Sequence, residues 1–195
     1  MALAEAAGAL RHGLVVAIPT DTVYGIAADA FAPGATARLF EAKRRPTDVR
    51  LPVLVNDIDQ AEGLAEVDDR ARALMQRFWP GGLTLILPRR SGVDIALGNG
   101  AGAPTVGVRC PDHVVPRTLC AEVGPLATTS ANLHGGPTPP TAEEVRALFG
   151  DSVAVVVDGG RCEGAPSTVV DCTRDKPALI REGKVAWSDV LGVAG

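Results

Sequence analysis

The stretch that most constrains the fold is a short apolar run that leads directly into a dense group of polar side chains. Residues 14–18 are aliphatic, and residues 19–25 include two threonines, an aspartate and a tyrosine. A β-branched run that ends at proline is typical of a buried strand. The polar side chains behind it either satisfy their own backbone in an Asx or Ser/Thr turn, or bind a polar ligand at the strand's end. Taken alone, the group favours the turn.

Two later stretches repeat this arrangement of an apolar strand pattern with polar residues at its end. Residues 105–109 end at Arg109, and residues 126–132 end in Ser130-Ala131-Asn132. In an open α/β sheet, ligands bind in the crevice outside the strand ends, where loops present hydroxyl and amide groups. The three strand ends therefore predict one shared polar crevice.

Composition limits the class of protein. The chain has 195 residues, of which 46% are hydrophobic and 22% are charged, and this predicts one globular domain over residues 1–195. With four Phe, two Trp and one Tyr, the core must be built from aliphatic residues, as in layered α/β folds. A net charge of −4 argues against the wrapping of a long nucleic acid but allows a small anion as ligand.

The sequence also limits the location of the protein and its metal chemistry. No apolar run approaches membrane-spanning length, and the N-terminus lacks the basic region of a signal peptide, so we expect a cytoplasmic protein without membrane contact. The four cysteines lie far apart, and the three histidines follow no metal-ligand spacing. We therefore expect reduced, partly buried thiols and no protein-held metal.

Periodicity predicts further elements along the chain. Helical spacing of apolar residues indicates helices at 3–10, near 33–45, 71–79 and 141–149, and apolar runs indicate strands at 51–55, 83–87, 153–157, 168–171 and 178–180. The Gly-rich segment 91–104 has little apolar periodicity and is expected to be a mobile surface connection that could close over the crevice.

A basic island in this acidic chain indicates a local anion. Lys43, Arg44, Arg45 and Arg50 are opposed locally only by Asp48. Cations at a helix C-terminus gain about 0.3–1 kcal/mol from the helix dipole, which accounts for the first two residues but not for the others. A polyphosphate held by several cations is the sharper hypothesis.

Two other polar groups each allow two interpretations. Arg109 can fork onto a carboxylate or phosphate of a ligand, or it can form a structural salt bridge. The Ser130-Ala131-Asn132 stretch and the Gly135-Gly136-Pro137 stretch behind it can cradle an anion or a base, or can form an ordinary turn.

Six blocks of sequence, in this order, resemble the YrdC-like threonylcarbamoyl-AMP synthases in their short, single-domain form. The resemblance continues to Arg181-Glu182-Gly183 and so covers nearly the whole chain. The six blocks are Pro19-Thr20-Asp21-Thr22-Val23-Tyr24-Gly25, Lys43-Arg44-Arg45-Pro46, Phe78-Trp79-Pro80-Gly81-Gly82-Leu83-Thr84, Val106-Gly107-Val108-Arg109, Ser130-Ala131-Asn132 and Ser167-Thr168-Val169-Val170-Asp171.

The resemblance implies an α/β fold, with a twisted open mixed sheet flanked by helices and a positively charged concave face. It also implies a nucleotidyltransferase that converts L-threonine, bicarbonate and ATP, with Mg²⁺ bound to ATP, into threonylcarbamoyl-AMP and pyrophosphate. A downstream threonylcarbamoyl-transferase complex would use this product to modify the adenosine next to the anticodon of tRNA as threonylcarbamoyladenosine.

The same resemblance implies a role for individual residues. The residues expected to contact threonine are Thr22, Arg109, Ser130 and Ser167. The residues expected to hold ATP are Lys43, Arg45, Thr105, Ser130, Asn132 and Arg181. The residues expected to be catalytic, through charge stabilisation, are Lys43, Arg45 and Arg109. No side chain is expected to ligate a metal.

Two other functions stay open at this point. A carbamoyl-transfer domain of the hydrogenase-maturation type shares this fold, but acylphosphatase-like and zinc-finger domains would be expected in the same chain. A non-catalytic RNA-binding or ribosome-assembly module would use a basic concave surface without chemistry. The net charge and the scarcity of aromatic residues count against the second, although a local patch could bind tRNA weakly.

Overall fold

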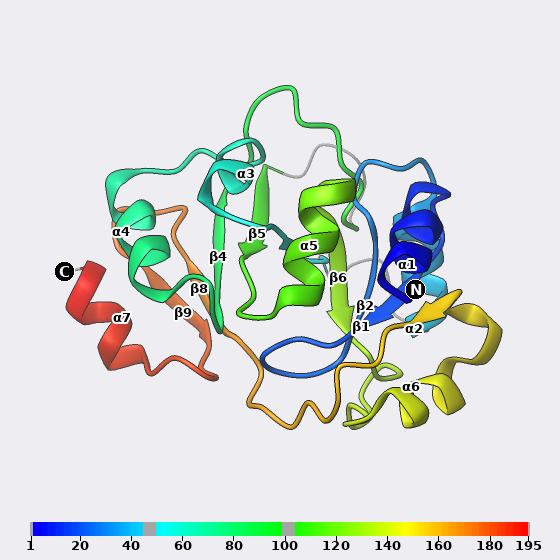
Figure 1. The fold of residues 1–195 in the computed structure, drawn as a ribbon. Helices are drawn as coiled ribbons and strands as arrows, with labels where there is room; N and C mark the ends of the chain where they lie inside the picture. Colours follow the sequence, from blue (N-terminus) through cyan, green and yellow to red (C-terminus); the bar gives the residue numbers. More distant parts are fainter. Residues whose placement is uncertain (1, 45–49, 99–103, 195) are drawn as a thin grey trace.

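A single mixed sheet runs through the molecule (Figure 1). The computed structural model describes residues 2–44, 50–98 and 104–194. Within these ranges the sheet has nine strands in the order β7-β1-β2-β6-β3-β5-β4-β8-β9. The strands are β1 Val16–Ile18, β2 Gly25–Asp29, β3 Val53–Leu54, β4 Leu83–Pro88, β5 Thr105–Arg109, β6 Leu126–Ser130, β7 Val155–Val156, β8 Thr168–Asp171 and β9 Ala178–Arg181.

The pairing of these strands confirms the predicted open mixed sheet. The antiparallel pairs are β1–β2, β2–β6, β3–β6, β4–β5 and β8–β9, and the parallel pairs are β1–β7, β3–β5 and β4–β8. The polar residues 19–25 follow β1, and Arg109 and Ser130 are the last residues of β5 and β6. The order and direction of the strands therefore decide whether these three strand ends lie close together. The positive charge expected on the concave face stays a prediction.

Helices flank the sheet, and Figure 1 shows α1 and α5 in front of it, with α4 and α7 near its β8–β9 end. The helices are α1 Ala2–Arg11, α2 Ala35–Lys43, α3 Ile58–Glu62, α4 Asp69–Phe78, α5 Val114–Val123, α6 Ala142–Phe149 and α7 Trp187–Ala194. Gly13, which follows α1, has φ +69°, a left-handed conformation that a glycine adopts without strain.

Aliphatic residues form the core, as the composition requires. The largest fully buried side chains are mainly Leu and Ile, with Met75 from α4 and the single tyrosine, Tyr24. Tyr24 is wholly buried, and its hydroxyl donates to the carbonyl of Gly160 at 2.9 Å while it accepts from the N–H of Gly159 at 3.1 Å. Its hydroxyl therefore holds the loop after β7 against the loop after β1.

Most of the predicted elements are confirmed, and the missed ones have weak local signals. The strands predicted at 105–109 and 168–171 coincide with β5 and β8. Strand β2 was not predicted, since two alanines and a glycine give it little β propensity. Helix α5 was not predicted because it begins with two valines and a proline, although proline is tolerated in a first helical turn. Helices α3 and α7 were missed as well.

The segment 91–104 differs from the prediction where the structure describes it. Ile95 and Leu97 are only 3% and 5% exposed, and the carbonyl of Leu97 accepts from the N–H of Leu51 at 2.9 Å. Contacts of two apolar side chains with the core can hold a loop in place, even where the sequence has no apolar periodicity. The predicted surface position is therefore wrong for Ile95 and Leu97, whereas the mobility of the segment stays a prediction, and residues 99–103 lie outside the described part.

The cysteines confirm the predicted reduced state. Cys110, Cys120, Cys162 and Cys172 are all free and buried. Burial raises the pKa of each thiol, to about 11 for Cys110 and Cys172. None of the helices in the described ranges has the length and the apolar character needed to cross a membrane.

Candidate active site

Two adjoining pockets lie where the predicted strand ends meet. Pocket A has a volume of about 260 Å³ and is lined by Arg50, Leu51, Pro52, Thr84, Ile86, Leu97, Thr105, Val106, Gly107, Ser167, Val169 and Arg181. Pocket B has a volume of about 290 Å³ and is lined by Thr20, Thr22, Val23, Pro52, Leu54, Thr84, Arg109, Thr128, Thr129, Ser130, Thr138, Pro166, Ser167 and Arg181. The three strand ends meet in pocket B, which confirms the shared crevice.

Thr20 builds the turn that carries Thr22 into pocket B. The Thr20 hydroxyl accepts from the N–H groups of Thr22 and Val23, at 3.1 and 3.2 Å, and donates to the Val23 carbonyl at 2.7 Å. The Thr22 hydroxyl lies 2.9 Å from that of Thr20. Either hydroxyl can be the donor of this pair. The Ser/Thr turn considered for this stretch is therefore present.

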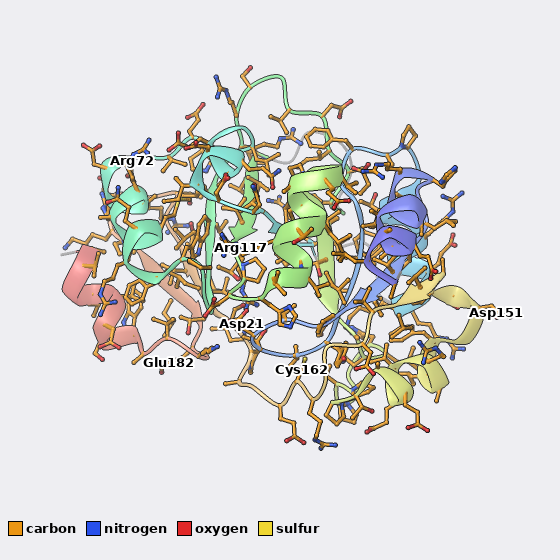
Figure 2. The ribbon with its side chains drawn as sticks, in the orientation of Figure 1. Asp21, Arg72, Arg117, Asp151, Cys162 and Glu182 are labelled. Carbon is orange, nitrogen blue, oxygen red and sulfur yellow. The ribbon has the colours of Figure 1, made fainter. Side chains whose placement is uncertain are left out.

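Asp21 does not take part in that turn, so the sequence alternative in which it caps its own backbone is wrong. Its Oδ1 atom accepts from Arg109 Nη2 at 2.6 Å and from the N–H of Asp112 at 3.1 Å, and its Oδ2 atom accepts from Lys184 Nζ at 3.1 Å. Figure 2 marks Asp21 on the loop that follows β1. The carboxylate thus joins three segments that are far apart in the sequence.

Arg109, the last residue of β5, forms the structural salt bridge considered for it and also lines pocket B, whereas its contact with a ligand stays a prediction. It is 7% exposed, and it donates from Nε to the Gly81 carbonyl at 2.9 Å and from Nη1 to the Thr22 hydroxyl at 3.0 Å, besides its salt bridge with Asp21. Burial lowers the pKa of Arg109, and the charge of Asp21 opposes this shift. These three bonds use three of the five N–H donors of a guanidinium. The residue is therefore anchored and still lines pocket B.

Arg181, at the end of β9, lines both pockets and contacts Ser167. Its Nη2 atom donates to the Ser167 carbonyl at 2.9 Å and to the Ser167 hydroxyl at 3.2 Å. The hydroxyl of Thr84 donates to that of Ser167 at 2.9 Å. Partial burial of its guanidinium lowers the pKa of Arg181, although the residue as a whole is exposed. Ser167 is therefore fixed at the border between pockets A and B.

Lys43, the last residue of α2, is buried behind the pockets. The residue is 3% exposed, and its ammonium donates to the Ser130 carbonyl at 2.7 Å, the Asn132 carbonyl at 3.0 Å and Asn132 Oδ1 at 2.8 Å. The Asn132 amide donates in turn to the carbonyls of Leu133 and Gly136. Lys43 and Asn132 thus build the loop that places Ser130 in pocket B, and neither of them is among the described residues that line pocket A or pocket B.

The remaining predicted residues do not all line the same pocket. Thr105 lines pocket A, where its hydroxyl accepts from Arg50 Nη1. Arg45 lies outside the described residues. The predicted residues that meet in pocket B are Thr22, Arg109, Ser130, Ser167 and Arg181.

The described ranges contain no group of three or more His, Cys, Asp or Glu side chains that could hold a metal ion. The buried carboxylate beside pocket B belongs to Asp21, and it is already bound by Arg109 and Lys184. A protein-held metal does not fit this set of donors. The polar groups that line pocket B are hydroxyls and guanidiniums, which are suited to carboxylates and phosphates.

Comparison with known proteins identifies the family. The Sua5/yciO/yrdC family model, which is described as telomere recombination, matches residues 8–183. This match includes both pockets. The chain belongs to the Sua5/yciO/yrdC family. The resemblance found from the sequence blocks is thereby confirmed.

Members of the Sua5/yciO/yrdC family with assigned names match nearly the whole chain. A putative threonylcarbamoyl-AMP synthase of Mycobacterium tuberculosis is 43% identical, and the match covers 99% of this chain and 89% of that protein. The threonylcarbamoyl-AMP synthase of Bacillus subtilis is also 43% identical, and the match covers 99% of this chain and 56% of that protein. The crystal structure of Sua5 from Pyrococcus abyssi complexed with L-threonine has a TM-score of 0.92 and 39% identity, with coverage of 99% and 57%. The chain thus spans little more than half of the latter two proteins.

Sequence reasoning missed the two ion pairs of Asp21 beside pocket B. Asp21 was considered as a turn residue or as part of a polar group that binds a ligand, and Lys184 was not considered, although it lies directly after Arg181-Glu182-Gly183. No signal in the sequence pairs positions 21 and 184. The excess of polar side chains at residues 19–25 was the available clue for Asp21.

Proposed function

We propose that this chain is an L-threonylcarbamoyladenylate synthase, a nucleotidyltransferase that forms threonylcarbamoyl-AMP and pyrophosphate from L-threonine, bicarbonate and ATP. One observation carries the proposal: the four residues expected to contact threonine, Thr22, Arg109, Ser130 and Ser167, all line pocket B. The synthase names of the relatives and the threonine complex of the Pyrococcus protein support the same substrates. Residues 1–195 would act as one domain.

In this proposal the two pockets divide the substrates. The Arg109 guanidinium would hold the threonine carboxylate in pocket B, beside the hydroxyls of Thr22 and Ser167. The nucleotide would occupy pocket A, where Thr105 and Arg181 are expected ATP contacts and the remaining wall is largely aliphatic. Ser167 and Arg181 line both pockets, so they would lie where the substrates meet.

The proposed chemistry needs no protein nucleophile. The threonine amine and bicarbonate would form a carbamate and release water, and a carbamate oxygen would then attack the α-phosphorus of ATP as the bond to pyrophosphate breaks. The protein would hold the reactants in line, which can supply on the order of 7–11 kcal/mol of the barrier. Cationic side chains would stabilise the negative charge that develops on the phosphates, and the candidates are Lys43, Arg45 and Arg109.

Lys43 and Arg45, two cations of the basic island, would contribute to catalysis in different ways. Lys43 is too buried to reach a ligand in the described conformation, so its catalytic role would run through Ser130 and Asn132, which its ammonium holds. Arg45 would contact the phosphates of ATP, as the resemblance implies. Mg²⁺ would enter with ATP and supply positive charge to its phosphates, because the described side chains offer no carboxylate cluster to hold it.

The setting of the reaction follows from its substrates. The product would pass to a threonylcarbamoyl-transferase complex for modification of tRNA, and the chain itself would bind tRNA only weakly. We propose the cytoplasm as the location of the reaction, where these substrates and tRNA meet. The carbamoyl-transfer and RNA-binding alternatives receive no support from the named relatives with 43% identity.

The proposal is tested by pyrophosphate release from ATP with purified protein and Mg²⁺, with threonine or bicarbonate omitted in turn. Release that requires both is the expected result. A folded protein that releases no pyrophosphate under any combination would contradict the synthase proposal and would favour the other two functions. Ser167→Ala is a useful variant here, because it removes a hydroxyl from the border of both pockets and should lower the rate at limiting threonine.

A further inference from the structure

We propose that Lys184 is a positioning residue for the amino-acid substrate, and that it acts through Asp21 on Arg109. This rests on the proposed function, in which the Arg109 guanidinium binds the threonine carboxylate. The observation behind it is a chain of two ion pairs, Arg109 to Asp21 and Asp21 to Lys184, which we call the Asp21 bridge. Lys184 itself lines neither pocket.

The Asp21 bridge runs from the wall of pocket B to the solvent. The distance from Arg109 Nη2 to Asp21 Oδ1 is 2.6 Å, and that from Lys184 Nζ to Asp21 Oδ2 is 3.1 Å. The side chains of Arg109 and Asp21 are 9% and 6% exposed, whereas that of Lys184 is 43% exposed. Lys184 also donates to the backbone carbonyl of Asp21 at 2.9 Å. It therefore closes the outer side of an otherwise buried ion pair.

Close backbone packing aims Lys184 at Asp21. Its N–H donates to the Pro166 carbonyl at 2.9 Å. Its aliphatic stem lies against Gly82, where an added Cβ would be 2.7 Å from the Cβ of Lys184. At Gly183 an added Cβ would fall 2.0 Å from the Pro166 carbonyl oxygen, so that only glycine fits before Lys184. These contacts distinguish Lys184 from a freely rotating surface lysine.

The net charge of the Asp21 bridge explains how Lys184 can affect the binding of the threonine carboxylate. Arg109 and Asp21 together carry no formal charge, and such a pair is a poor receptor for a carboxylate. With Lys184 the bridge has one net positive charge, and Lys184 occupies the Oδ2 atom of Asp21, which Arg109 does not contact. In a poorly solvated site the net charge of such a cluster strongly affects anion binding.

Calorimetric titration with L-threonine tests this role in the full chain. Lys184→Met should raise the Kd for threonine by about fivefold, since one charge is removed at the border of the site. Lys184→Arg, which keeps the charge, should restore most of the affinity. The matched control is Lys176→Met, which removes the same charge from an exposed position in the turn before β9 and should leave the Kd unchanged.

A double-mutant cycle separates action through Asp21 from a general effect of charge. In an Asp21→Asn background, Lys184→Met should change the Kd by less than about a third of its effect in the wild type, because the group that couples them is gone. An equal effect in both backgrounds would overturn the proposal, as would an unchanged Kd in Lys184→Met. If Asp21→Asn does not fold, the Lys184→Met and Lys184→Arg pair still decides. A wild-type chain that does not bind threonine would instead contradict the proposed function itself.

Discussion

At the scale of single residues, the site depends on cations that are buried and tightly bound to the protein. Arg109 donates to Gly81, Thr22 and Asp21, and the Lys43 ammonium donates to oxygens of Ser130 and Asn132. Removing such charges from water costs several kcal/mol unless hydrogen bonds replace the lost hydration. These bonds fix the cations in place, so a ligand meets groups that need no rearrangement.

Arg109→Met should damage both stability and threonine binding. It leaves the buried Asp21 carboxylate with Lys184 and a backbone N–H as partners, so we expect a loss of about 3 kcal/mol in the free energy of unfolding and loss of threonine-dependent pyrophosphate release. Urea unfolding and the release assay measure the two effects. Arg117→Met, at an exposed residue of α5 that lines neither pocket, is the control. Threonine affinity that survives in Arg109→Met would refute the role of this residue.

His113 should make the stability depend on pH. Its Nδ1 atom accepts from the N–H of Val115 at 3.2 Å at the start of α5, and burial lowers its pKa below the ordinary value of 6.5. The unfolded chain then takes up the proton first, so stability is lost as the pH falls below 6.5. His113→Asn keeps a capping group but no titratable one. Urea unfolding above and below that pH should show a smaller loss in this variant than in the wild type.

At the scale of elements, local capping signals specify helix ends without reference to the site. The Thr141 hydroxyl accepts from the N–H of Glu144 at 3.3 Å and donates to its carboxylate at 3.0 Å, at the N-terminus of α6. This contact agrees with the capping-box spacing of these two residues. Helix α6 contributes no residue to either pocket.

Thr141→Ala should therefore cost stability but not function. Loss of an N-cap hydroxyl typically costs about 1 kcal/mol. Thermal unfolding measures the loss, and Thr141→Ser, which keeps the hydroxyl, should retain most of the stability. Pyrophosphate release should stay at the wild-type rate in both variants. A lower rate in a folded Thr141→Ala protein would show that α6 is coupled to the site.

At the scale of the whole molecule, two aliphatic clusters pack on the sheet and enclose the thiols. Cys110, Cys162 and Cys172 belong to the larger apolar cluster, and Cys120 lies in the smaller one between α1, α5 and the sheet. The pKa of Cys110 and Cys172 is raised to about 11, so the reactive thiolate is scarce at neutral pH. The thiols therefore report on opening of the entire core.

A thiol reagent such as Ellman's reagent should label the native protein slowly and label all four cysteines at once in denaturant. The labelling rate should rise along with the unfolded fraction across a urea titration. Cys162→Ala should remove one equivalent of label and leave pyrophosphate release unchanged. Rapid stoichiometric labelling of a native thiol would contradict the burial described here.

The sequence alone was sufficient for those features whose physical cause is local. Apolar runs marked β5 and β8, helical spacing marked α4, and the order of motif blocks indicated the family and its substrates. Local signals failed where an element depends on its neighbours: β2 is held by β1 and β6 on either side despite its weak propensity.

Only the tertiary structure decided which polar residues share a site. Thr22, Arg109, Ser130 and Ser167 each look like an ordinary strand or turn residue, and sheet order brings them into pocket B. It also placed Lys43 behind the pocket rather than in it, and joined Asp21 to Lys184. The physical reason is that backbone conformation depends on neighbours in sequence, whereas contacts between charged side chains depend on long-range strand pairing that leaves no local pattern.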